Sequence, residues 1–248
     1  MWLFDTLVAL HVLTGTVGLV TLWVPIVGRK GGAVHRRWGL VFARALLATG
    51  LLAIGISLTT LAWPLETHGF WDDAALIRGI FGWMMLYLAT LTIQLSRYGL
   101  LCIRNRRNHA ANREPLNVAL QLATLATALN CAWHGARLDQ PLMIGISVVG
   151  TASALLNLKF IYTAEPALNE WLVQHTRGLV GAGISVYTAF LAFGAVNLVP
   201  ALALHPGLWA TPCTLGVALL VYHQGRIVLR RRRLASRDAA RHVAGRTA

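Results

Sequence analysis

The sequence predicts an all-α, polytopic membrane protein in which seven transmembrane helices pack into one bundle. Hydrophobic residues make up 56% of the 248 residues, charged residues make up 12%, and the mean hydropathy is +0.58. A soluble domain carries about 25% charged residues. Apolar runs of about 20 residues, the length that crosses a hydrocarbon core of about 30 Å, recur along the chain. These runs are continuous rather than alternating, which excludes a transmembrane β-barrel.

Seven spans follow one another along the chain. They are expected at Trp2–Val27, Trp38–Trp63, Ala74–Ile103, Pro115–Ala136, Pro141–Tyr162, Trp171–Val199 and Leu208–Leu229. The third run is the longest, so this helix is expected to tilt or to extend past the membrane. The fourth and fifth runs each begin with proline, which suits the first turn of a helix because no N–H is needed there.

The segments between the spans are rich in charged residues, which are unfavourable in the hydrocarbon core of a bilayer. A basic turn at Gly28–Arg37 separates the first two spans, and a loop at Arg104–Arg113 separates the third from the fourth. Residues 1–230 are expected to form one transmembrane domain. Residues 231–248 are expected to form a basic, disordered cytoplasmic tail.

Basic residues set the predicted orientation. All of the 22 Lys and Arg residues except Arg78 and Arg137 fall on the side that holds the Gly28–Arg37 turn, the Arg104–Arg113 loop and the tail. The positive-inside rule places that side in the cytoplasm. The expected orientation is N-terminus out and C-terminus in, across a bacterial inner membrane. The Arg230–Arg233 run is interpreted as facing the lipid bilayer, with no nucleic acid as partner.

Histidines in and beside the spans are the candidate functional residues, because buried polar groups in a bilayer are costly. By depth along the spans they form an outer pair, His11 and His134, and an inner group, His35, His175 and His223. The two groups lie on opposite sides of the bilayer. Each group therefore predicts a separate site.

Small residues smooth the helix faces beside two of these histidines. Gly15 and Gly18 share the face of His11, and Gly178 shares the face of His175. A porphyrin ring requires an axial nitrogen with little side-chain bulk around it. The pattern predicts one or two b-type haems that pass electrons across the membrane, to or from a quinone or a soluble redox partner. The expected haem ligands are His11 and His134 on the outer side, and His175 with His223 or His35 on the inner side.

Two other interpretations stay open. Small residues at four-residue spacing are ordinary packing in membrane helices, and histidine can hydrogen-bond between helices, as in a non-catalytic structural or interaction protein. Alternatively, His35, His175 and His223 hold a zinc ion with an open fourth position for water. Glu165 or Glu170 would then be the base of a hydrolase acting on a lipid or amphiphile at the cytoplasmic face.

Several familiar sites are absent from the sequence. Lys30 and Lys159 are the only lysines, so the last span offers no lysine for a retinal Schiff base. No GxSxG, HExxH or Walker-type motif occurs. The intramembrane arginines lie within about two turns of the cytoplasmic span ends, where snorkelling to the headgroups is expected. These arginines are Arg44, Arg97 and Arg177.

Three short stretches carry a family resemblance. They are the segment His11–Gly18, the turn His35-Arg36-Arg37 with Gly39, and Trp171 to His175 leading into Thr188-Ala189-Phe190. Together they resemble the bacterial multi-pass proteins grouped as domain of unknown function 2306. The resemblance implies a seven-span inner-membrane protein and implies no activity. A fainter similarity is to haem-b membrane cytochromes, which place histidine pairs on different helices near each membrane face.

Overall fold

A computed structural model describes residues 2–69, 71–194, 211–212 and 214–229. These ranges are helical and contain no β-strand. The longer helices are α1 (Trp2–Thr21), α3 (Ala33–Ala62), α6 (Met85–Arg104), α7 (Pro115–Arg137), α8 (Pro141–Tyr162) and α9 (Glu170–Ala189). The short helices are α2 (Trp23–Val27), α4 (Pro64–Thr67) and α5 (Ala74–Ile77), the π-helices η1 (Arg78–Met84) and η3 (Phe190–Gly194), and the 3₁₀ helix η2 (His109–Arg113). A further helix covers Thr214–Leu229.

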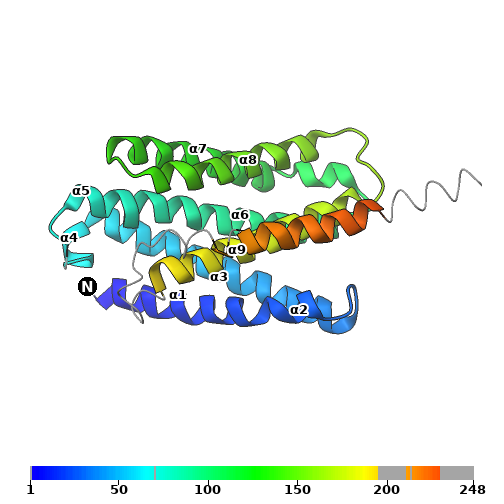
Figure 1. Cartoon of the computed structure of the whole chain (residues 1–248), viewed down its shortest axis with the longest axis horizontal. Helices are drawn as coiled ribbons and strands as arrows, with labels where there is room; N and C mark the ends of the chain where they lie inside the picture. Colours follow the sequence, from blue (N-terminus) through cyan, green and yellow to red (C-terminus); the bar gives the residue numbers. More distant parts are fainter. Residues whose placement is uncertain (1, 70, 195–210, 213, 230–248) are drawn as a thin grey trace, which may run out of the picture.

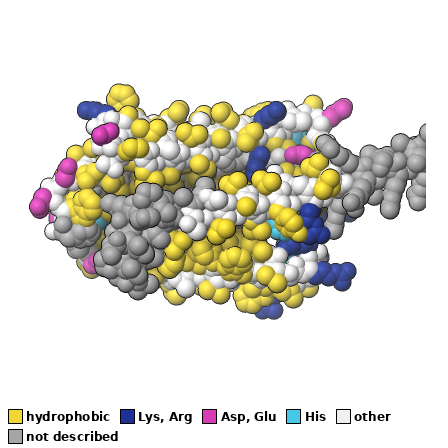
Figure 2. Space-filling model, viewed as in Figure 1, with side chains coloured by type: hydrophobic (Ala, Val, Ile, Leu, Met, Phe, Trp, Pro, Cys, Tyr) yellow, Lys and Arg dark blue, Asp and Glu magenta, His cyan; other side chains and the backbone are white. Residues whose placement is uncertain are grey.

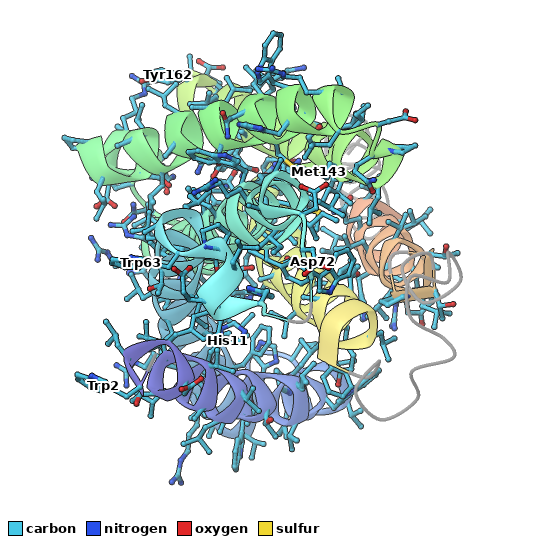
Figure 3. The ribbon with its side chains drawn as sticks, turned by 90° about the vertical axis from the view of Figure 1, so that its left-hand side faces the viewer. Trp2, His11, Trp63, Asp72, Met143 and Tyr162 are labelled. Carbon is cyan, nitrogen blue, oxygen red and sulfur yellow. The ribbon has the colours of Figure 1, made fainter. Side chains whose placement is uncertain are left out.

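The long helices pack side by side in a layered bundle (Figure 1). The α7–α8 pair lies on one side and α1 lies on the opposite side, with α3, α6 and α9 between them. The end view gives the same order, with Trp2 and His11 on the lowest helix and Met143 in the upper pair (Figure 3). The central helix α6 contacts α3, α7 and α9. As a result, α1 and α7 lie on opposite sides of α6.

The two ends of the bundle differ in charge (Figure 2). We name the end that holds Lys30, Arg104 and Arg113 the basic end, and the end that holds Asp72 and Asp139 the acidic end. Most of the visible Lys and Arg side chains gather at the basic end, whereas acidic side chains dot the other. The described helices therefore keep the charge asymmetry that was expected from the sequence.

Five described helices are long and apolar enough to cross a membrane: Trp2–Val27, Ala33–Ala62, Ala74–Arg104, Pro115–Arg137 and Pro141–Tyr162. They correspond to the first five predicted spans and are compatible with a multi-pass membrane protein. The predicted sixth span appears as α9 followed by η3, and its last residues, 195–199, lie outside the described residues. For the seventh, only residues 211–212 and 214–229 are described. The predicted tail, 231–248, also lies outside them.

The second span begins earlier than the sequence suggested. The prediction started it at Trp38, but α3 starts at Ala33, which places His35 in its first turn rather than in a loop. Gly31, at φ 76°, and the extended Gly32 end the preceding turn. No residue after Gly32 breaks a helix, so the charged residues are incorporated into α3.

The third span is one long helix with a π-helical segment near its start. Helices α5, η1 and α6 run without interruption from Ala74 to Arg104. The widened turns lie where glycines approach neighbouring side chains: a Cβ at Gly79 would lie 2.2 Å from Leu138, and one at Gly82 would lie 2.5 Å from Leu61. The helix is the most buried of the five candidate spans, which follows from its three packing partners.

Candidate functional site

Three of the candidate histidines share one hydrogen-bonding arrangement. The Nδ1 atom of His11 lies 3.0 Å from the carbonyl oxygen of Thr49, and that of His175 lies 2.9 Å from the carbonyl oxygen of Gly99. The Nδ1 atom of His35 lies 3.1 Å from the carbonyl oxygen of Pro25. A carbonyl only accepts, so each Nδ1 carries the proton and each Nε2 keeps its lone pair. Ring nitrogens in metal sites are oriented in this way.

The outer pair is not brought together. His11 is hydrogen-bonded across the α1–α3 contact, whereas His134 stacks on Trp83 with ring centroids 5.3 Å apart. Their helices, α1 and α7, lie on opposite sides of α6. The glycines beside His11 are occupied by helix packing, since Gly15 faces Thr49 and Gly18 faces the side chain of Leu46. This arrangement agrees with the packing interpretation of the first-span glycines.

Two members of the inner group are neighbours at the basic end. His35, from α3, and His175, from α9, lie within electrostatic range of each other. His223 lies within the same range of Lys30 and Arg226. Among the described residues, no three His, Cys, Asp or Glu side chains form a group that could hold a metal ion. The structure thus groups His35 with His175, and groups His223 with two cations.

A close crossing of α6 and α9 fixes His175. A Cβ at Gly178 would lie 2.9 Å from the backbone of Gly99 and 2.9 Å from the carbonyl oxygen of Leu95. Only glycine permits this approach, because the contacting atoms are backbone and cannot rotate away. The approach is also what brings the Gly99 carbonyl to the His175 ring. Gly178 therefore positions the histidine rather than leaving an open face beside it.

Cations surround the inner histidines. Lys30 donates hydrogen bonds from Nζ to the carbonyl oxygens of Pro25 and Ile26 at the end of α2. Burial, and secondarily the nearby Arg226 guanidinium, lower the pKa of Lys30 below its ordinary value. Arg226 itself bonds the hydroxyl of Tyr222 at 3.1 Å. This corner of the basic end is therefore suited to receive negative charge.

The structure also contains a buried polar cluster that the histidine-centred prediction missed. Amide side chains from three helices meet at the oxygen Oε1 of Gln121, to which Gln94 donates at 2.7 Å and Asn157 donates at 3.2 Å. All three residues are 0% exposed. We call this group, extended by the residues below, the amide cluster. Its members are Gln94 and Tyr98 of α6, Asn117 and Gln121 of α7, Asn157 of α8, and Gln174 and Arg177 of α9.

Arg177 contributes the positive charge of the amide cluster. Its Nη2 donates to Oδ1 of Asn157 at 2.5 Å, and its guanidinium lies beside the phenol of Tyr98. Its Nε is buried and has no hydrogen-bond partner among the described residues. Snorkelling was expected here; Arg177 is half-buried, and its Nη2 is hydrogen-bonded to Asn157 of α8. The described ion pairs both use Glu114, which pairs with Arg97 and Arg104.

A cavity of about 290 Å³ opens at the basic end beside this cluster. It lies between the loop that joins α6 to α7 and the loop that joins α8 to α9. Its polar lining includes Asn105, Arg106 and Asn112, and its apolar lining includes Phe160 and Trp171. Because Asn105 donates to Oδ1 of Asn112 at 3.2 Å, the two amides hold the two sides of the first loop together.

The described helices form an all-helical bundle that is compatible with a multi-pass membrane protein, with two candidate histidines and an amide cluster near one end. Comparison of the chain with protein-family models, with curated proteins and with solved structures gives no match.

Proposed function

We propose that the chain is a seven-span inner-membrane protein that binds a b-type haem at its basic end and transfers electrons. The observation that carries this proposal is the shared arrangement of His35 and His175, each anchored by Nδ1 to a backbone carbonyl. Both rings donate Nδ1–H to a backbone carbonyl, and both leave Nε2 as the free coordinating atom. They come from different helices and lie within electrostatic range of each other.

The topological part of the proposal rests on five apolar helices and on charge. With the basic end in the cytoplasm, the N-terminus lies outside, and α9 with η3 and the Thr214–Leu229 helix supply the sixth and seventh spans. A reporter fused after Arg246 is expected to behave as cytoplasmic. Periplasmic behaviour of that fusion would contradict the orientation.

The residues around the histidine pair suit a haem. His35 and His175 would hold the iron, and the haem would supply a one-electron couple when bound. Lys30 and Arg226 lie at the same corner and would offset the carboxylates of the two propionates. The backbone carbonyls of Pro25 and Gly99 keep the two rings oriented and make their Nε2 atoms better donors to iron. Electrons would pass to or from a quinone or a soluble redox partner.

Absorbance of the purified protein tests the proposal. Protein from haem-replete cells is expected to show a Soret band that His35→Ala and His175→Ala each remove. His68→Ala, a change at the acidic end, is the matched control and is expected to keep the band. A colourless wild-type preparation would overturn the haem proposal. A band that survives His35→Ala but not His11→Ala would move the site to the outer side.

The same preparation separates haem from zinc. Elemental analysis of protein purified without a chelator or a His-tag is expected to give iron and no stoichiometric zinc. Zinc near one per chain that disappears in His223→Ala would instead favour the hydrolase interpretation with His35, His175 and His223 as ligands. Absence of both metals would leave the histidines as hydrogen-bonding groups between helices.

A further inference from the structure

A second site in the bundle follows from the charge of Arg177. A guanidinium stays protonated in proteins, so Arg177 brings a permanent positive charge into the amide cluster. Its partners among the described residues, Asn157 and Tyr98, are neutral. Arg177 is half-buried, and its buried Nε has no hydrogen-bond partner among the described residues. A buried donor that is left without a partner is costly. An anion bound beside Arg177 would remove that cost.

Two carboxylates at the basic end, Glu114 and Glu170, have ion-pair or hydrogen-bond partners other than Arg177. Glu114 pairs with Arg97 and Arg104. Glu170, one turn before Gln174 on α9, accepts a hydrogen bond from the Gln174 amide at 2.8 Å. The Gln174 side chain is in turn the acceptor for the hydroxyl of Tyr98 at 3.0 Å. Glu170 is therefore tied to the start of α9, two turns away from Arg177 along the helix.

A continuous set of hydrogen bonds joins the cavity to Arg177. The Asn117 amide donates to the carbonyl oxygen of the cavity residue Asn112 at 2.7 Å, and Gln121 donates to Oδ1 of Asn117 at 3.4 Å. Gln121 then accepts from Asn157, which accepts from Arg177. Hydrogen-bonded polar groups thus continue from the cavity at the basic end of the bundle to Arg177.

Two aromatic rings lie between the cavity and the amide cluster. Phe160 lines the cavity and packs edge-on against Tyr98, with ring centroids 6.4 Å apart. Tyr98 is 0% exposed, and its hydroxyl donates to Gln174 within the amide cluster.

The mouth of the cavity also carries positive charge. Arg106 lines the cavity and Arg107 follows it in the loop, whereas Arg104, at the end of α6, pairs with Glu114. Clefts lined by charge of one sign raise the local concentration of the opposite ion. Phe160 and Trp171 supply an apolar wall. The volume corresponds to roughly ten water molecules at about 30 Å³ each, which limits the ligand to a small molecule.

We propose that the amide cluster and the cavity form a binding site for a small carboxylate with an apolar body, with Arg177 as the residue that binds the carboxylate. The guanidinium fork matches the geometry of a carboxylate, and the apolar wall accepts the rest of the molecule. This site is separate from the histidine pair. His175 precedes Arg177 by two residues and faces the Gly99 backbone instead.

Benzoate is a suitable probe, and benzamide is its neutral match in shape. Purified full-length protein in detergent is expected to bind benzoate, by calorimetry or radioligand dialysis, at least tenfold more tightly than benzamide. Arg177→Gln is expected to abolish this preference, and Arg177→Lys is expected to retain part of it. Arg44→Gln removes an exposed arginine of α3 and is the matched control. It is expected to bind as the wild type does.

The proposal would be overturned if the wild-type protein bound benzoate and benzamide equally, or bound neither. This test uses the wild-type protein alone, so it does not depend on whether a variant folds. Unchanged benzoate preference in a folded Arg177→Gln protein would also overturn it. Arg106→Gln, an exposed change, is expected to slow benzoate association and to reduce its dependence on ionic strength. Loss of the Soret band has no bearing on these outcomes, so the two sites are tested separately.

Discussion

The α1–α3 contact and the α6–α9 contact both cross at glycines, but they differ in what meets the glycine. At Gly18 of α1, the near atom is the Leu46 side chain, at 2.5 Å from the position of a Cβ. At Gly178 of α9, the near atoms belong to the backbone of α6. Both contacts place a backbone carbonyl against a histidine. The first is a fit of glycine to a side chain, whereas the second is a backbone-to-backbone approach that lies close to the amide cluster.

This difference shows how the same residue type serves two purposes in one bundle. Lipid tails are as apolar as leucine, so helices in a bilayer associate through close packing and hydrogen bonds rather than through the hydrophobic effect. The α1–α3 contact combines packing with the His11–Thr49 and Thr49–Thr14 hydrogen bonds. The contacts of α6 with α7 and α9 add buried amide and guanidinium hydrogen bonds, which specify one arrangement. We expect the second region to tolerate change less.

The largest effect is expected at the α6–α9 crossing. Gly178→Ala places a methyl group against backbone atoms that cannot rotate away, and it displaces the Gly99 carbonyl from His175. The cost is expected to be about 3 kcal/mol of the free energy of unfolding, at the upper end for overpacking. Denaturant titration in detergent measures it. Gly145→Ala on α8, where no neighbouring atom lies within 4 Å, is the matched control and is expected to be neutral or slightly stabilising.

A smaller loss is expected in the amide cluster. Gln121→Leu leaves the buried amides of Gln94 and Asn157 without their shared acceptor, so it is expected to destabilise the protein by about 2 kcal/mol. The same titration applies. Thr127→Val on the same helix removes a hydroxyl that bonds only its own helix. If the two variants lost equal stability, the hydrogen bonds of the amide cluster would not contribute more to stability than a hydroxyl bonded within its own helix.

The α1–α3 contact is expected to tolerate a larger residue with a smaller loss of stability. Gly18→Ala meets a leucine side chain, which can change its rotamer, so the expected cost is about 1 kcal/mol. A cost as large as that of Gly178→Ala would remove the distinction between the two regions. Thermal unfolding of both variants under one set of conditions makes the comparison direct.

The smallest effect is a pH dependence at the acidic end. His68 stacks on Phe81 with ring centroids 4.3 Å apart, and burial lowers its pKa below the ordinary value. The unfolded chain therefore takes up the proton first as the pH falls. The free energy of unfolding should decline from about pH 6.5 down to the folded-state pKa and then level off. His68→Phe is expected to remove this decline, and an unchanged decline would assign it to another group.

Most of the fold was predictable because hydropathy and proline report on long helices. The fifth span was predicted with its observed bounds, Pro141–Tyr162. The start of α3 was wrong by five residues, because charge suggested a loop where nothing after Gly32 prevents a helix. The π-helical turns of Arg78–Met84 were not foreseen. They depend on how Gly79 and Gly82 fit against neighbours that are distant in sequence.

The candidate sites were less accessible to prediction. Histidine attracted attention because its buried nitrogen is costly, and the same reasoning applies to Gln94, Gln121 and Asn157. Each of these amides lies inside an apolar run, which was the available signal. The three amides meet at Oε1 of Gln121 because of the way α6, α7 and α8 pack, and a single sequence does not reveal that packing. The haem and zinc interpretations stay predictions.

The position of α6 at the centre of the bundle also constrains the order in which the chain is made. On the proposed topology, the ribosome finishes α6 at Arg104 and then needs roughly 2–7 s to finish α7 at Arg137, at about 5–20 residues per second. During that interval Gln94 has no amide partner, because Gln121 is still to be synthesised or inserted. We therefore expect chains that stop before α7 is complete to insert less stably than longer chains.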